Sequence, residues 1–163
     1  MKRLTIVRHA KSSWDYQVSD RNRPLLERGI SDAQLVASFL SKNQTLFTHA
    51  KIFVSTANRA LHTCTIFCET MNLAVSEVKI TKELYEFSSE SVMAFVKSLP
   101  DELENVMIFG HNPAFTSVCN TFGNREIDNL PTAGVAVIDF ESNTWRNIHK
   151  GKTILTIFPK QLK

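Results

Sequence analysis

The fold of this 163-residue chain is decided by the stretch Leu4-Thr5-Ile6-Val7-Arg8-His9-Ala10. Its short run of apolar and β-branched residues predicts a buried strand over 4–7, which two polar residues follow directly. The arrangement recurs twice: a predicted strand over 51–54 precedes Ser55-Thr56-Ala57-Asn58-Arg59, and one over 106–109 precedes Gly110-His111-Asn112-Pro113. Because ligands of open α/β sheets bind beyond the carboxyl ends of the strands, we expect a common rim for Arg8, His9, Arg59 and His111.

The rest of the chain continues the alternation of strands and helices. Apolar spacing predicts helices over 31–40, 58–71, 90–99 and 113–121, and further strands over 78–80, 135–140 and 153–158. The second of these helices is expected to be capped by Asn58 or Thr56. The alternation indicates an α/β fold of one domain, residues 1–163, built as a three-layer α/β/α sandwich with a mostly parallel sheet. No long helix separates the last two strands, so we expect an antiparallel edge strand.

The composition excludes several classes of protein. With 43% hydrophobic and 21% charged residues, the chain is typical of a soluble globular domain. Its net charge of +3 is too small to indicate a nucleic-acid partner. No apolar run has the length of a secretory signal or a membrane span. An odd number of cysteines, three, fits a reducing compartment. We therefore expect a cytoplasmic protein that contacts neither membrane nor nucleic acid.

The residues at the predicted rim suit a bound dianion. Arginine stays protonated and offers a planar fork that matches phosphate oxygens. Neutral imidazole is a competent nucleophile at neutral pH, provided that its second nitrogen donates to a fixed acceptor such as a backbone carbonyl. The chemistry needs positioning and charge stabilisation, so we expect no metal and no cofactor.

The motifs that begin at Val7, Ser55 and Gly110 resemble those of the histidine phosphatase superfamily, which has the phosphoglycerate mutase-like fold. The N-terminal region also resembles the small SixA-type phosphohistidine phosphatases, in Arg8-His9-Ala10-Lys11-Ser12-Ser13-Trp14 and in Asp20 to Pro24 with Leu25 and Gly29. Further similar segments are Leu84-Tyr85 and Leu130-Pro131-Thr132.

The resemblance implies that His9 is the nucleophile, that the phosphoryl group is bound by Arg8, Arg59 and His111, and that water hydrolyses a phosphohistidine intermediate. The sequence departs from the larger members of the superfamily at Ala10, where many have Gly followed by Glu. It also has no large insertion between the strand at 78–80 and the helix at 90–99. An open site of this kind would admit a phosphorylated side chain of another protein.

Three further site residues are candidates. Glu86, in the segment after the third strand, is either the general acid or a solvated loop residue. Arg23 either approaches the phosphate or pairs with Asp20, and we favour the pairing. Asn112 follows His111 directly and is a candidate for binding the substrate.

The sequence therefore predicts a metal-independent phosphatase that acts on phosphohistidine in a protein, such as a domain of a signalling phosphorelay. One alternative is a phosphomonoesterase for a small substrate, either a sugar phosphate or a nucleotide. The other is a non-catalytic module that binds a phosphorylated partner, which would require an incomplete set of catalytic residues.

Overall fold

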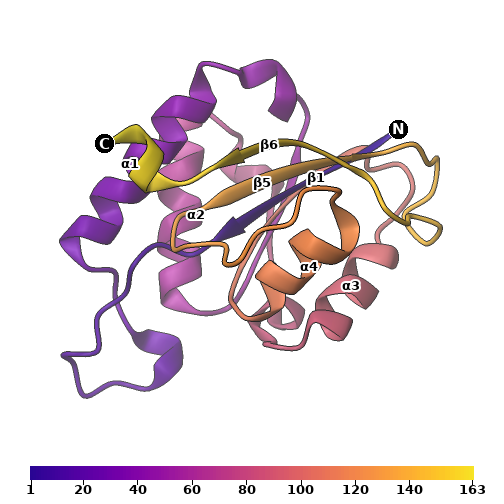
Figure 1. Ribbon diagram of the computed structural model, residues 1–163. Helices are drawn as coiled ribbons and strands as arrows, with labels where there is room; N and C mark the ends of the chain where they lie inside the picture. Colours follow the sequence, from indigo (N-terminus) through magenta and orange to yellow (C-terminus); the bar gives the residue numbers. More distant parts are fainter.

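The computed structural model describes residues 1–163 and contains one six-stranded sheet in the order β3-β2-β4-β1-β5-β6 (Figure 1). The strands are β1 Lys2–Arg8, β2 Lys51–Val54, β3 Val78–Ile80, β4 Asn105–Gly110, β5 Val135–Phe140 and β6 Lys152–Ile157. Strands β1 to β4 pair in parallel, whereas β5 pairs antiparallel with both β1 and β6. The mostly parallel sheet with antiparallel pairing at one edge is confirmed. The strand that runs against the others is β5, one position in from that edge.

Helices cover both faces of the sheet and complete the three layers (Figure 1). The α-helices are α1 Glu27–Ser41, α2 Asn58–Met71, α3 Ser89–Lys97 and α4 Ala114–Phe122. Short 3₁₀ helices are η1 Asp20–Asn22, η2 Gln44–Phe47, η3 Val75–Glu77, η4 Lys82–Tyr85 and η5 Pro159–Leu162. Helices α1 and α2 lie on one face, and α3 and α4 lie on the other. No helix has both the length and the apolar character needed to cross a membrane.

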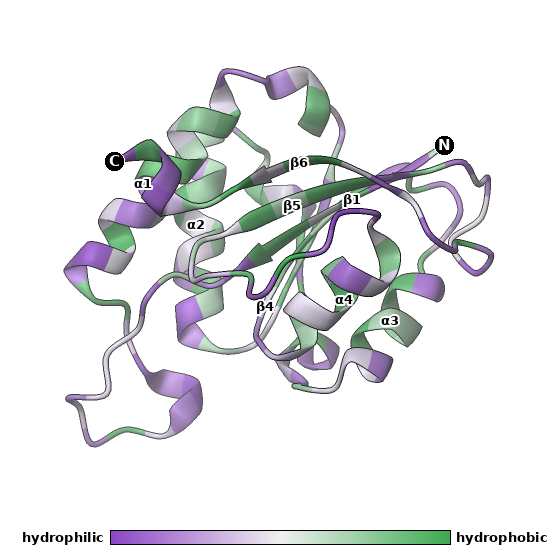
Figure 2. Ribbon diagram, in the orientation of Figure 1, coloured by the Kyte–Doolittle hydropathy of each residue, from purple (hydrophilic) through white to green (hydrophobic).

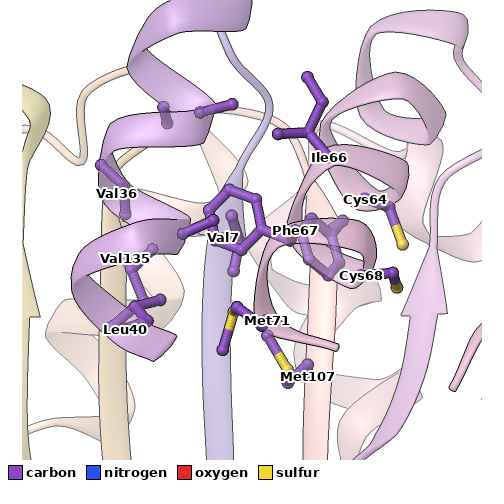
Figure 3. Packing of buried hydrophobic residues seen from close by; sticks show 14 of the residues in the cluster. Val7, Val36, Leu40, Cys64, Ile66, Phe67, Cys68, Met71, Met107 and Val135 are labelled. Carbon is purple, nitrogen blue, oxygen red and sulfur yellow. The ribbon is translucent and has the colours of Figure 1, made fainter. Parts of the chain in front are cut away.

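Two apolar cores, one on each face, fix the sheet between the helices. The hydropathy colours of Figure 2 show that β1 and β5 are mostly hydrophobic, whereas hydrophobic and hydrophilic residues alternate along the helices. Figure 3 shows the core beneath α1 and α2, where Phe67 and Met71 approach Val7 of β1. Cys64 and Cys68 also lie in this core as free, buried thiols. Strand β1 thus packs on both faces, which holds its carboxyl end rigidly.

The structure corrects the predicted start of α1 and the predicted cap of α2, whereas α3 and α4 lie within two residues of their predicted bounds. Helix α1 begins at Glu27, four residues before the predicted start, so Gly29 lies inside it rather than before it. The cap of α2 is Ala57, and no side chain accepts a hydrogen bond there, so the prediction of a cap by Asn58 or Thr56 is wrong. Neither Leu26, the N-cap of α1, nor Ala57 supplies a side-chain acceptor to its helix.

Gly29 lets α1 approach the loop that follows His9. A β-carbon at this position would lie 2.2 Å from the carbonyl oxygen of Lys11, well inside contact distance. The same carbonyl accepts a hydrogen bond from the amide of Leu26, at 2.9 Å. The absence of a side chain at Gly29 therefore allows the close contact between α1 and the loop.

We predict that Gly29→Ala lowers the free energy of unfolding by about 1–3 kcal/mol, because the added methyl group overpacks a rigid backbone contact. In an unobstructed helix the same change would instead add about 1 kcal/mol of stability. Urea denaturation of the variant and of Ser38→Ala, an exposed control in α1, measures the difference. A Gly29→Ala protein that is as stable as the wild type or more stable would contradict this packing argument.

Candidate active site

The two central strands bring the two predicted histidines together. In the parallel pairing of β1 with β4, Arg8 lies opposite Gly110, so the next residues, His9 and His111, leave the sheet side by side. The amide of His9 donates to the carbonyl of Gly110, at 3.0 Å. The ring centroids of the two histidines are 5.1 Å apart. Both side chains are almost completely buried.

The backbone fixes which nitrogen of His9 carries the proton. Its Nδ1 lies 2.7 Å from the carbonyl oxygen of Ala10. Because a carbonyl only accepts hydrogen bonds, Nδ1 must be the donor, and the lone pair of a neutral ring then resides on Nε2. The amide of Ala10 is held in turn by Thr63 Oγ1, at 2.9 Å. The amide of Ala133, a residue with φ of 60°, lies 3.1 Å from the carbonyl of His9.

Both histidines are held in their neutral form. Burial lowers the pKa of His9 to about 3; the Ala10 carbonyl opposes this effect, and charge repulsion from His111, Arg59 and Arg8 adds to it. Burial and the charge of Arg59 likewise lower the pKa of His111 to about 3. At neutral pH the Nε2 lone pair of His9 is therefore available.

The two predicted arginines approach from different elements. Arg59 is the second residue of α2 and is 2% exposed; its Nη1 and Nη2 donate to the carbonyl and carboxylate of Asp20, at 2.7 and 3.1 Å. Arg8 ends β1, and its Nη1 donates to the carbonyl of Leu130, at 3.0 Å. Burial lowers the pKa of Arg8, which still leaves a cationic side chain at neutral pH.

Three nitrogen atoms of this group are buried and have no hydrogen-bond partner. They are Arg8 Nε, Arg59 Nε and His111 Nδ1, and outside this site only Thr5 Oγ1 and Asn105 Oδ1 share that condition. Buried polar atoms are normally paired, because an unpaired one costs about 1–3 kcal/mol. A group of unpaired nitrogens beside one pocket is typical of a site whose hydrogen-bond acceptor is the ligand.

The pocket at these residues is small. It encloses about 250 Å³ and is lined by Arg8, His9, Lys11, Ser12, Trp14, Asp20, Arg23, Arg59, Phe87, His111, Asn112 and Thr132. Four of these residues are lysine or arginine, and Asp20 is the only acid among them. With both imidazoles neutral, the lining carries a net positive charge and attracts anions.

Of the three remaining predicted site residues, two line the pocket and one lies outside it. Arg23 reaches the pocket and also pairs with Asp20, at 3.2 Å, as favoured from the sequence. Asn112 lines the pocket too, but its amide is engaged with Asn129, Leu130 and Thr116. Glu86 lies outside, in a neighbouring groove of about 820 Å³ that shares only Phe87 with the pocket.

Ser55 and Tyr85 belong to the site but were not among the predicted site residues. Ser55 Oγ lies 2.8 Å from His111 Nε2, and the Tyr85 hydroxyl donates to Asp20 Oδ2, at 2.6 Å. The ring of Tyr85 also lies 5.5 Å from that of His111. The place of Ser55 directly after β2 was a usable signal, since the other site residues also follow strand ends. Tyr85 does not follow a strand end, although its segment, Leu84-Tyr85, was among those that resemble the SixA-type proteins.

Ser55 determines the tautomer of His111. Its Oγ accepts a hydrogen bond from the amide of Ala57, at 3.2 Å, and Nε2 is the only acceptor within hydrogen-bond distance of the buried hydroxyl, so we infer that the hydroxyl donates to Nε2. A neutral ring that accepts at Nε2 carries its hydrogen on Nδ1. The Nδ1 of His111 therefore carries a hydrogen and has no acceptor in the protein.

We predict that ¹⁵N NMR at pH 7.5 finds both His9 and His111 with their hydrogen on Nδ1. In Ser55→Ala, His111 should shift toward the Nε2–H form because Nε2 loses its donor, whereas His9 should be unchanged. Ser55→Thr retains the hydroxyl group and is the matched control. An Nε2–H form of His111 in the wild type would show that the serine accepts rather than donates.

Comparisons with known proteins agree with this geometry. The sequence profile of the histidine phosphatase superfamily (branch 1) matches residues 4–93. The uncharacterized protein ML1117 of Mycobacterium leprae is 27% identical over 93% of this chain and 98% of its own length. The structure of the protein histidine phosphatase SixA complexed with tungstate matches with a TM-score of 0.80 and 25% identity, over 99% of each chain.

A more distant structure shares the fold. A phosphoserine phosphatase from Entamoeba histolytica, in complex with 3-phosphoglyceric acid, matches over 100% of both chains with a TM-score of 0.70 and 14% identity. The fold is therefore that of the phosphoglycerate mutase-like proteins. Since the superfamily profile covers more than half of the sequence, the chain belongs to the histidine phosphatase superfamily.

Proposed function

We propose that this protein is a phosphatase in which Nε2 of His9 accepts the phosphoryl group and water then releases it. The observation that carries the proposal is the group of unpaired buried nitrogens, Arg8 Nε, Arg59 Nε and His111 Nδ1, beside a neutral His9. A phosphoryl group presents three oxygens and up to two negative charges to these donors, one oxygen and one charge more than a carboxylate. Tungstate, bound by the related SixA structure, is likewise an oxyanion.

The reaction divides into two transfers at phosphorus. The Nε2 lone pair of His9 attacks phosphorus, and the bond to the leaving group breaks with its electron pair passing to that group. Arg8, Arg59 and the Nδ1–H of His111 bind the oxygens on which charge is spread. Water then attacks the phosphorus, the P–N bond to His9 breaks, and the electron pair returns to Nε2. The proton of the attacking water passes to solvent as phosphate leaves.

We further propose phosphohistidine in a protein as the substrate. A pocket of about 250 Å³ is smaller than ordinary small-molecule sites of about 300–1,000 Å³, so it suits a phosphoryl group whose carrier remains outside. The only acid that lines it is Asp20. Burial alone would raise the pKa of this carboxyl, but hydrogen bonds from Tyr85 and Arg59 lower it to about 2. An ionised carboxylate cannot protonate a leaving group, and imidazole leaves without protonation more readily than an alkoxide.

One observation favours a small phosphate ester as a second candidate. The groove of about 820 Å³ beyond Phe87 could hold the body of a small molecule. Glu86 lines that groove next to Phe87, the residue that the groove shares with the pocket, and is the candidate acid for an alkoxide leaving group there.

Phosphate release from a phosphorylated histidine protein should fall at least ~10³-fold in His9→Ala, because the nucleophile is lost. Wild-type protein quenched during turnover with a ³²P-labelled substrate should carry acid-labile label on His9. Phosphate release is measured on the histidine protein and on an aryl phosphate in parallel. Equal rates for the variant and the wild type would refute the proposed mechanism, and absence of label would favour a module that only binds.

Glu86→Gln should leave phosphohistidine turnover unchanged, because Glu86 lies outside the pocket that holds His9. Glu83→Gln, in the same groove, is the control for nonspecific changes. The kcat for phosphohistidine and for sugar phosphates is measured for each variant. Loss of ester hydrolysis alone would make Glu86 the acid for esters and support the second candidate. Loss of phosphohistidine turnover would contradict the proposal that hydrolysis of phosphohistidine needs no general acid.

A further inference from the structure

A carboxylate of the chain itself occupies the cationic side of the pocket. Asp20 Oδ2 lies 3.1 Å from Arg59 Nη2 and 2.6 Å from the Tyr85 hydroxyl. Its Oδ1 accepts from Arg23 Nε, at 3.2 Å. One carboxylate therefore contacts two of the arginines that line the pocket, and both oxygens are in use.

The two partners in this contact, Arg59 and Asp20, differ in solvent exposure. The Arg59 side chain is 2% exposed, whereas the Asp20 side chain is 42% exposed. Asp20 begins η1, in the loop between β1 and α1 that projects from the body of the protein (Figure 1). The same loop exposes large apolar side chains at Trp14 and Tyr16. The guanidinium group is thus enclosed by the protein, while the carboxylate lies next to solvent.

We propose that Asp20 is a specificity-determining residue, a resident anion that competes with the phosphoryl oxygens for Arg59 and Arg23. This inference rests on the proposed function, because it concerns the same site. A ligand must replace the bonds of Asp20 or tolerate its charge, so only an anion with several strong acceptors binds well. After hydrolysis, the carboxylate can rebind the arginines as phosphate leaves, which hastens product release.

A purely structural role for Asp20 predicts the opposite effect. If the carboxylate served only to orient Arg59, its loss would disorder the guanidinium group and weaken anion binding. If it competes, its loss removes a negative charge beside the bound anion and strengthens binding. The direction of the change therefore separates the two roles.

The experiment measures the Kd of inorganic phosphate and of tungstate by calorimetry for the wild type and Asp20→Asn. The amide keeps the size of the side chain and one acceptor for arginine but removes the charge. We expect both anions to bind about 10- to 100-fold more tightly, as expected for loss of a like charge at contact range. Asp15→Asn, an exposed change in the same loop, is the control and should match the wild type.

Steady-state kinetics give a second readout. Asp20→Asn should lower KM and the product-inhibition constant of phosphate together, with kcat reduced if release becomes rate-limiting. Tyr85→Phe, which removes one hydrogen bond to the carboxylate but retains the ring, should tighten phosphate binding in the same direction by a smaller factor. This variant keeps the test decisive if Asp20→Asn does not fold.

Unchanged or weaker phosphate binding in both variants would overturn the competition. The outcome is independent of turnover, because calorimetry needs no catalysis. Tighter binding without any phosphatase activity would support the competition while rejecting the proposed function. Normal phosphohistidine turnover without tighter phosphate binding would support the proposed function while rejecting the competition.

Discussion

The site depends on the register between β1 and β4. Parallel pairing of the two central strands places Arg8 opposite Gly110, so the chain delivers one imidazole from each strand at the same height above the sheet. A shift by one residue would move each side chain to the other face and separate the rings. Apolar cores on both faces of the sheet specify this register, so packing energy, rather than any contact between the histidines, determines their distance.

Sequence patterns predicted the strand ends because short apolar runs followed by polar residues are local signals. They predicted Arg8, His9, Arg59 and His111 at one rim, and these residues line one pocket. The pairing of Asp20 with Arg23, three residues away, was predicted, but its contacts with Arg59 and Tyr85 have no local signal because these residues are 39 and 65 positions away. Likewise, the role of Gly29 depends on its contact with Lys11, in a loop that a sequence pattern does not place.

The buried polar groups of the site also reduce the stability of the folded chain. Two imidazoles are buried in their neutral form, and three nitrogens of the cationic cluster lack acceptors. Such unpaired donors reduce the stability of the folded chain. Their residues also line the pocket, where donors held in place by the fold favour a charged transition state. Asp20 pairs with other nitrogens of Arg59 and Arg23 and leaves these three donors unpaired.

The loop that carries Asp20 also contains an exposed tryptophan, whose fluorescence depends on its surroundings. The ring of Trp14 is 75% exposed, and the Cζ atom of Arg23 lies 3.4 Å from its centroid. Arg23 is bonded to Asp20, so the indole rests on the same ionic cluster that a ligand would rearrange. Trp145, the other tryptophan of the chain, is entirely enclosed on the opposite side of the sheet from α1 and α2 and is insulated from such events. The protein therefore contains its own fluorophore for following, in real time and without labelling, the arrival of an oxyanion.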